Sequence, residues 1–142
     1  FTDTKELELN VLLKQYLQDY EEVYDYRNIE VTIDEQDIFN VTMNESLAVA
    51  LLTNLLKNAF VHNIDGGHIR ITVTKNSITF RNSGVENPLD KEHIFERFYQ
   101  GTKKEGSTGL GLAIADSICR LQHLSIRYYF EQKEHCFEIS RQ

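Results

Sequence analysis

Residues 106–112 have the sequence Gly-Ser-Thr-Gly-Leu-Gly-Leu, and an apolar run with helical spacing, Ala113 to Leu121, follows at once. Glycines let backbone N–H groups approach an anion closely, and the first turn of a helix adds unpaired N–H donors and the positive end of the helix dipole. The segment therefore predicts a phosphate site. A flexible turn before a core helix is the competing interpretation, because short glycine motifs recur by chance.

Composition indicates one ordinary domain of 142 residues, of which 41% are hydrophobic and 26% charged. The formal net charge of -7 argues against broad nucleic-acid binding, since that requires a basic surface. Cys119 and Cys136 lack metal-ligand spacing and indicate no disulfide framework, which fits a reducing, cytosolic setting. No apolar run is long enough to span a bilayer. The chain starts at Phe1 rather than Met, so we expect it to be a piece of a longer protein.

Hydrophobic spacing predicts three helices and five or six strands within a single domain, residues 1–142. The helices are expected from Asn10 to about Tyr20, from Asn44 to about His62, and over about 109–123, with the two asparagines as N-caps. Alternating residues predict strands over 28–33, 38–41, 68–74, 78–82, 126–130 and 135–139. Strands that meet in hairpins favour antiparallel pairing, with helices over one sheet face, and therefore an α+β fold.

Two amides interrupt the apolar face of the predicted central helix. Asn54 and Asn58 are four residues apart, so they share one side of the helix, and their neighbours are largely leucines. Amides are poor choices in an apolar helix unless they find partners. A hydrated Mg²⁺ with nucleotide phosphates would supply those partners, because Mg²⁺ takes oxygen ligands. The alternative is that both amides face solvent or cap a neighbouring strand.

Four segments occur in the order of known ATP-site boxes, and they are Asn54-x-x-x-Asn58-Ala59, Asn82-x-Gly84, Ile94-Phe95-Glu96-Arg97-Phe98 and Gly109-Leu110-Gly111-Leu112. They resemble the N box, first glycine box, F box and second glycine box of the ATP-binding catalytic domain of sensor histidine kinases. That domain belongs to the Bergerat-fold ATPases, alongside gyrase and a heat-shock chaperone. The resemblance covers nearly the whole chain. It implies a two-layer α/β sandwich with a mixed, mostly antiparallel sheet and about three helices on one face.

The resemblance implies a role for each matching residue. Asn58 would hold Mg²⁺, Asn54 would help to position phosphate or water, and Arg97 would reach the phosphates, so these three would be the catalytic residues. Asn82 would receive the adenine amino group, and Gly84 would let the adenine ring approach the backbone.

Further contacts with ATP are implied around the helix tip. His62 occupies a position where the family often has an aromatic residue that contacts the nucleotide, although an ordinary helix-end histidine fits equally well. Phe95 and Phe98 would anchor the base of a mobile lid over about 99–108. The residues that would wrap the phosphates are Thr108, Gly109, Leu110 and Gly111.

Three positions depart from the family pattern. Asn82 replaces the usual Asp, and we expect adenine preference to be kept with affinity weaker by up to about 1 kcal/mol, because hydrogen bonds to charged groups are the stronger ones. Val61 stands where a lysine is common, which removes one cation near the phosphates. Gln100 replaces a frequent lid arginine, for which Lys103 and the neighbouring Lys104 are candidate substitutes.

The implied function is transfer of the γ-phosphoryl group of ATP to a histidine on a separate helical dimerisation domain, with a response regulator downstream. The parent protein is then expected to be a homodimer anchored in the membrane, with this domain in the cytoplasm. Two alternatives stay open. A serine kinase of the anti-sigma type shares the fold, although the run Phe95–Tyr99 favours the histidine kinase. A non-catalytic interaction module with a decayed nucleotide site is favoured by Val61, Asn82 and Gln100.

The phosphoacceptor histidine of the family is normally followed by an acidic residue and, soon after, a proline. None of the five histidines here is followed by an acid-x-x-x-Pro pattern, and Pro88 is the one proline of the chain. We therefore expect the acceptor helix to lie upstream of Phe1, with the general base beside it.

From this we predict that the chain alone binds ATP with Mg²⁺ but does not phosphorylate itself. The domain would contribute positioning and charge neutralisation, whereas the acceptor lies on another segment. Incubation with ATP labelled at the γ-phosphate, followed by gel electrophoresis, measures the outcome. Substantial labelling of the isolated chain would contradict the prediction.

Overall fold

The computed structural model describes residues 3–99 and 109–142, and this part of the chain forms three α-helices, one 3-10 helix and seven strands. The helices are α1 (Leu9–Val23), η1 (Asp25–Arg27), α2 (Glu45–Val61) and α3 (Gly111–Leu121). The strands are β1 (Lys5–Glu8), β2 (Glu30–Glu35), β3 (Asn40–Met43), β4 (His68–Val73), β5 (Ser77–Asn82), β6 (Leu124–Glu131) and β7 (Glu134–Arg141).

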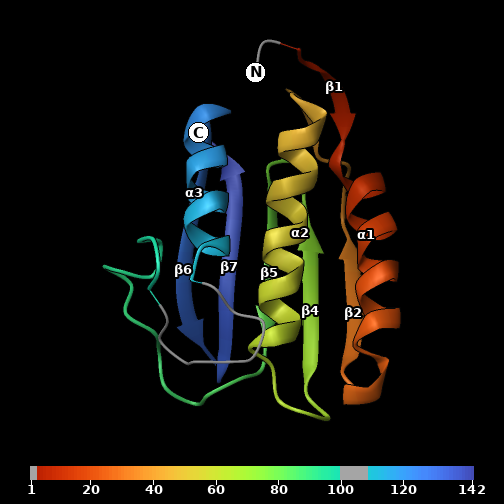
Figure 1. Cartoon of the computed structure of the whole chain (residues 1–142). Coiled ribbons are helices and arrows are strands. Elements are labelled where there is room, and N and C mark those ends of the chain that lie inside the picture. Colours follow the sequence, from red (N-terminus) through yellow and green to blue (C-terminus); the bar gives the residue numbers. More distant parts are fainter. Residues whose placement is uncertain (1–2, 100–108) are drawn as a thin grey trace.

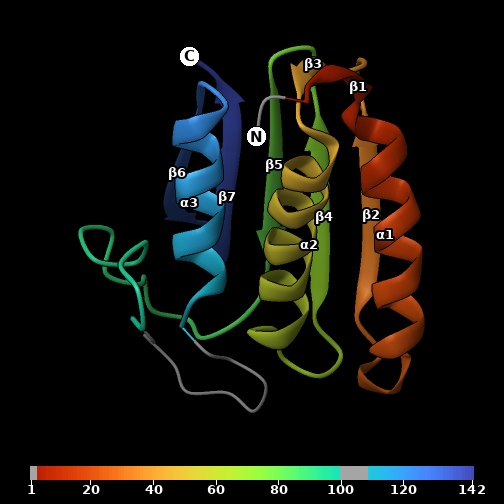
Figure 2. The same ribbon diagram turned by 45° about the horizontal axis from the view of Figure 1, so that its top comes forward.

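Five strands form one sheet in the order β2-β4-β5-β7-β6. The β2–β4 pair is parallel, whereas the other three pairs are antiparallel. Strands β1 and β3 form a separate antiparallel pair. The three α-helices lie side by side over one face of the five-stranded sheet (Figures 1 and 2). The predicted α+β sandwich, with its mixed and mostly antiparallel sheet, is confirmed.

Helix α2 is the centre of the helical layer, between α1 and α3 (Figure 1). It packs against both neighbouring helices and against β5. Most of its surface is therefore apolar and buried, and each fully buried leucine contributes about 2 kcal/mol of hydrophobic stabilisation. The buried residues of α2 are Leu47, Ala48, Leu51, Leu52, Leu55, Leu56, Ala59, Phe60 and Val61.

The prediction that Asn10 caps the first helix is wrong. Glu8 occupies the N-cap position without a side-chain hydrogen bond, and Asn10 lies inside α1. The buried amide of Asn10 instead donates to Glu35 Oε2 (2.9 Å) and to the carbonyl of Asp37 (3.0 Å), and its Oδ1 accepts from the N–H of Phe39 (2.9 Å). Asn10 therefore fastens α1 to the connection between β2 and β3.

The predicted cap of the central helix is confirmed, because Asn44 Oδ1 accepts from the N–H of Leu47 at 3.0 Å. The third helix is shorter than the predicted range of about 109–123. Left-handed backbone at Gly109 (φ 76°) and His123 (φ 59°) flanks it on both sides. Such conformations do not continue an α-helix, which confines the regular turns to α3.

An ion pair joins the beginning of β7 to β4 across the sheet. The buried carboxylate of Glu134 accepts from Arg70 Nε (2.8 Å) and Nη2 (2.7 Å), and His68 Nε2 lies 2.7 Å from it. Arg70 is the main reason that the pKa of Glu134 falls from 4.5 to about 2, against the opposing effect of burial. The folded state therefore favours the ionised carboxylate.

We expect the Glu134→Gln variant to lose about 2 kcal/mol of unfolding free energy at pH 7, because Arg70 loses a buried charged partner. The stabilisation by the Glu134 carboxylate is fully present above pH 4.5. It disappears as the pH falls toward 2, because the carboxyl group of the folded wild type then becomes protonated. Urea unfolding at pH 7 and near pH 2 measures both values. Glu131→Gln, an exposed position on β6, is the matched control. An equal loss for Glu134→Gln at both pH values would contradict the account.

Candidate functional site

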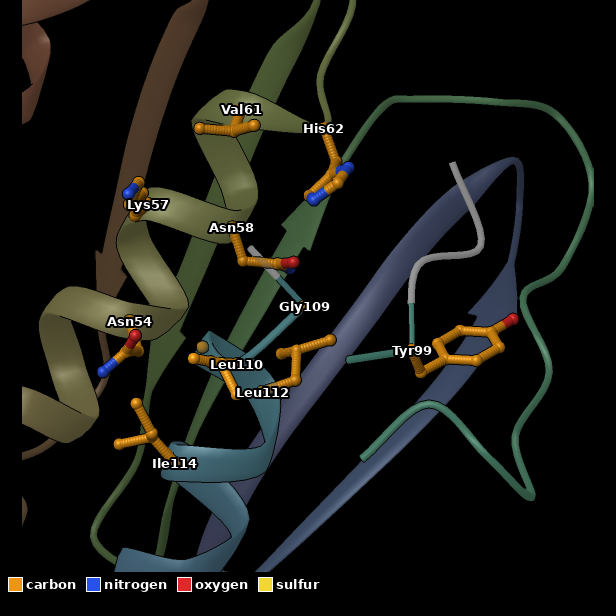
Figure 3. A pocket seen from close by; sticks show the side chains of 11 residues that line it. Asn54, Lys57, Asn58, Val61, His62, Tyr99, Gly109, Leu110, Leu112 and Ile114 are labelled. Carbon is orange, nitrogen blue, oxygen red and sulfur yellow. The ribbon is translucent and has the colours of Figure 1, made fainter. Parts of the chain in front are cut away.

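A pocket lies where the carboxyl-terminal half of α2 faces the beginning of α3 (Figure 3). The structure thereby brings together Asn58 and Gly109, which are 51 positions apart in the sequence (109 minus 58). The sequence-predicted residues that line the pocket are Asn54, Asn58, His62, Gly109, Leu110 and Gly111. The other lining residues are Lys57, Val61, Tyr99, Leu112 and Ile114.

The α2 wall of the pocket follows from helical spacing. Lys57 and Asn58 lie three and four residues after Asn54, and Val61 lies four and three residues after them, so the four side chains form one stripe on the helix. In Figure 3, these side chains and His62 extend from successive turns of α2, and the Asn58 amide points toward the segment that contains Gly109. The polar stripe interrupts an otherwise apolar helix.

The two asparagine amides present oxygen to the pocket in different ways. Asn54 Nδ2 donates to the carbonyl of Ala50 at 2.7 Å, which leaves Oδ1 directed toward α3. A Cβ added at Gly111 would lie 3.0 Å from this Oδ1, so glycine permits the close approach. The half-buried side chain of Asn58 makes no hydrogen bond to the described part of the chain. Both side chains are therefore positioned to interact with a ligand in the pocket.

The opposite wall is the amino-terminal tip of α3. Leu110 is its N-cap and supplies no side-chain hydrogen bond, and no acidic residue occupies the first turn. The first N–H groups of a helix lack partners within the helix and carry its positive dipole end. This tip therefore favours an anion, and phosphate is the anion that helix tips of this kind commonly bind.

Glycine at position 109 is required by the packing of the backbone. Its φ of 76° disfavours other residues, and an added Cβ would lie 2.7 Å from the Cα of Phe98. The N–H of Phe98 donates to the carbonyl of Gly109 at 2.6 Å. The predicted F-box segment and the glycine segment are thus joined at this point.

The F-box residues occupy different environments. Phe95 packs edge-on against Phe137, with ring centroids 6.3 Å apart, and so anchors the segment to β7. Phe98 is 67% exposed and has a left-handed φ of 65°. The guanidinium of Arg97 lies 5.6 Å from the centre of the Phe98 ring, and neither residue lines the pocket. Arg97 thus lies outside the pocket lining, and its contact with the phosphates stays a prediction.

Part of the predicted lid lies outside the described residues. Lys103 and Thr108 belong to this part, as do Gln100 and Lys104. Tyr99, which precedes it, is described and lines the pocket.

Asn82 lies at the end of β5, is 1% exposed and does not line the pocket. Its Nδ2 donates to the carbonyl of Ser83 at 2.8 Å, which identifies Oδ1 as the free acceptor. Within the described ranges, this Oδ1 is the one buried side-chain polar atom without a hydrogen-bond partner. An unsatisfied buried acceptor costs about 1–3 kcal/mol, so the atom marks a place where a ligand donor would be stabilising.

Gly84 is also buried and outside the pocket lining. A Cβ at this position would lie 2.8 Å from the carbonyl oxygen of His62 and 3.2 Å from His135 Cδ2. The absence of a side chain therefore brings the end of β5 against the end of α2. Gly84 thus lies between His62 on the pocket wall, which it contacts, and Asn82, which precedes it by two residues.

Lys57 is the main pocket residue that the sequence analysis did not select. It is exposed and adds a cation to the α2 wall, in which Val61 occupies the position of the missing family lysine. Its spacing of three residues from Asn54 indicates in the sequence that both side chains lie on the same side of the helix. Tyr99, Leu112 and Ile114 were also missed as pocket residues, because their positions depend on tertiary packing.

No helix in the described part of the chain is long and apolar enough to cross a membrane.

Comparison with known proteins identifies the family. Residues 43–140 match the family described as "Histidine kinase-, DNA gyrase B-, and HSP90-like ATPase", and the chain belongs to this family. Heme sensor protein HssS of Staphylococcus aureus is 33% identical over 127 residues, which cover 86% of this chain and 28% of HssS. The chain therefore spans little more than a quarter of that relative.

Solved structures narrow the assignment within the family. The catalytic domain of histidine kinase ThkA matches with a TM-score of 0.85 and 26% identity, over 97% of this chain and 94% of that domain. ThkA in complex with the response regulator TrrA matches with a TM-score of 0.77 and 25% identity, over 98% of this chain and 42% of ThkA. The predicted Bergerat fold and resemblance to a histidine kinase catalytic domain are thus confirmed.

Proposed function

We propose that this domain binds ATP with Mg²⁺ and transfers the γ-phosphoryl group to a histidine on a separate helical domain. The observation that carries the proposal is the pocket in which the amides of Asn54 and Asn58 face the tip of α3. A triphosphate placed there meets N–H donors on one side and oxygen ligands for its metal ion on the other. The domain's membership in the histidine kinase-like ATPase family supports this arrangement.

The residues present suit Mg²⁺, which prefers oxygen ligands and binds through one or two protein groups, phosphates and waters. Asn58 would hold the ion, because its half-buried amide faces the pocket without another described hydrogen bond. Asn54 Oδ1 would position a water or phosphate beside Gly111, and Lys57 adds positive charge on the same wall. When bound, Mg²⁺ neutralises charge on the phosphates.

The base would be recognised through Asn82. Because Nδ2 is engaged by the Ser83 carbonyl, the amide offers an acceptor, which suits the exocyclic amino group of adenine. Guanine presents a carbonyl oxygen instead, and would leave two acceptors facing each other. Binding of the base requires movement near His62 and Gly84, because Oδ1 is buried outside the pocket lining.

The remaining chemistry depends on partners. Phosphoryl transfer is catalysed largely by positioning and electrostatic stabilisation, so this chain would hold the triphosphate in place while the acceptor histidine approaches from its own helical domain. The phosphoryl group would then pass to a response regulator, the class of partner found with ThkA. The parent protein is proposed to be a membrane-anchored homodimer that places this domain in the cytoplasm.

Asn58→Ala is expected to weaken ATP binding about 10- to 100-fold in the presence of Mg²⁺, the effect of losing a contact to a charged group. Without Mg²⁺, the variant and the wild type should bind ATP equally weakly. Calorimetry with and without the metal measures both effects. Asn76→Ala, in the turn between β4 and β5, is the control.

Unchanged Mg²⁺-dependent affinity in Asn58→Ala would refute the assigned metal contact. A folded wild-type domain that binds no ATP in either condition would favour the decayed interaction module instead.

ATP is expected to outcompete GTP for the wild-type site, since Asn82 offers only an acceptor. Asn82→Asp should bind ATP up to about fivefold more tightly, because a charged acceptor strengthens the hydrogen bond to the amino group. Competition against a fluorescent ATP analogue measures the affinities, with Asn76→Asp as the control for added charge. GTP that competes as well as ATP with the wild type would rule out this role.

A further inference from the structure

A second group of buried polar side chains adjoins the proposed base site from the side of the sheet. His135 on β7 pairs in register with Asn82 on β5. Its ring is 4% exposed, and a Cβ at Gly84 would come within 3.2 Å of His135 Cδ2. The imidazole therefore lies directly against the backbone that the adenine ring is proposed to approach.

The hydrogen bonds of His135 have a defined direction. His135 Nε2 lies 2.6 Å from the carbonyl oxygen of Val85, which only accepts, so Nε2 carries the proton. Burial lowers the pKa of His135 and keeps the ring neutral, which leaves Nδ1 as an acceptor. The hydroxyl of Tyr128 lies 2.7 Å from Nδ1 and donates to it. The Tyr128 oxygen in turn accepts from the N–H of Leu89 at 3.0 Å.

These bonds fasten one loop to the sheet. Residues 85–88 are exposed, and the two bonds from Val85 and Leu89 are the hydrogen bonds that the backbone of residues 85–89 makes to described residues. The same loop connects Gly84 to the F-box segment. The hydrogen bonds that hold the loop to the sheet therefore come from one tyrosine and one histidine, beside the packing of Leu89 on the core.

Ring packing makes this attachment rigid. The rings of Tyr128 and His135 stack with centroids 5.9 Å apart and an interplanar angle of 22°. Phe130 packs on the same imidazole at 4.8 Å. Buried polar groups are stabilising only when hydrogen-bonded, and here the hydroxyl and both ring nitrogens have partners.

We propose that Tyr128 and His135 are positioning residues for nucleotide recognition, which hold the 85–89 loop so that Gly84 and Asn82 form the base site. The inference rests on the proposed ATP-binding function and adds residues from outside the four sequence motifs. They act through the loop backbone rather than by touching the nucleotide. Loss of the pair should therefore reduce recognition of the base while leaving the phosphate wall between α2 and α3 intact.

Tyr128→Phe tests the proposal, because it keeps the ring and removes the hydroxyl that joins Leu89 to His135. Amide exchange at Leu89 should accelerate at least about fivefold, and ATP affinity should fall about fivefold, the scale of one hydrogen bond. GTP affinity should stay the same, so the ATP-to-GTP preference falls. The readouts are hydrogen exchange followed by NMR and competition binding on the whole chain.

Tyr129→Phe is the matched control, because it makes the same chemical change at the next residue. Its ring lies 4.6 Å from the Arg127 guanidinium, and its hydroxyl makes no hydrogen bond to the described residues. This variant should keep wild-type exchange at Leu89 and wild-type nucleotide preference.

A second variant, His135→Asn, retains a donor and an acceptor on a smaller side chain and should also reduce the ATP-to-GTP preference.

The outcomes separate this inference from the proposed function. Tyr128→Phe with wild-type affinities for ATP and GTP would overturn the positioning role alone, and so would an equal loss for both nucleotides. A wild-type chain that binds no ATP would overturn the proposed function and this inference together. If Tyr128→Phe does not fold, His135→Asn decides by the same readouts.

Discussion

The arrangement of the site depends on how closely α2 and the tip of α3 approach each other. Asn54 and Asn58 interrupt the mostly buried helix α2. Amides in such a helix are costly unless polar groups face them. Gly111 permits contact with Asn54, while Gly109 takes a left-handed conformation against Phe98. A side chain at Gly111 would press against Asn54 on the opposite wall, and one at Gly109 would clash with the backbone of Phe98.

A second polar junction holds the carboxyl-terminal end of α2 beside the sheet. Asn63 is fully buried, and its Nδ2 donates to the carbonyls of Ala59 (3.1 Å) and His68 (3.0 Å). The Ser83 hydroxyl donates to Asn63 Oδ1 at 2.6 Å. The arrangement places His62, at the end of α2, close to Gly84. Side chains outside the pocket lining thus determine where the pocket and the buried acceptor of Asn82 lie relative to each other.

Local patterns predicted the layers and the two hairpins, because helical and strand periodicity report directly which side chains share a face. The amide spacing on α2, the glycine motif before α3 and the family resemblance together predicted six of the residues that line the pocket. They did not predict that Asn10 bonds to the β2–β3 connection, since an asparagine beside a helix start has the same local pattern as a cap. Lys57 was predictable from its spacing to Asn54. The Tyr128–His135 pair was not, because its contacts join residues from β6, β7 and a distant loop.

The most direct test of the account is an NMR titration of the labelled chain with a nonhydrolysable ATP analogue and Mg²⁺. The account predicts that the largest shifts occur at the backbone amides of Gly111 and Leu112 and at the side-chain amides of Asn54 and Asn58, and that they need the metal. Shifts confined to the open face of the sheet, or none at the tip of α3, would contradict it.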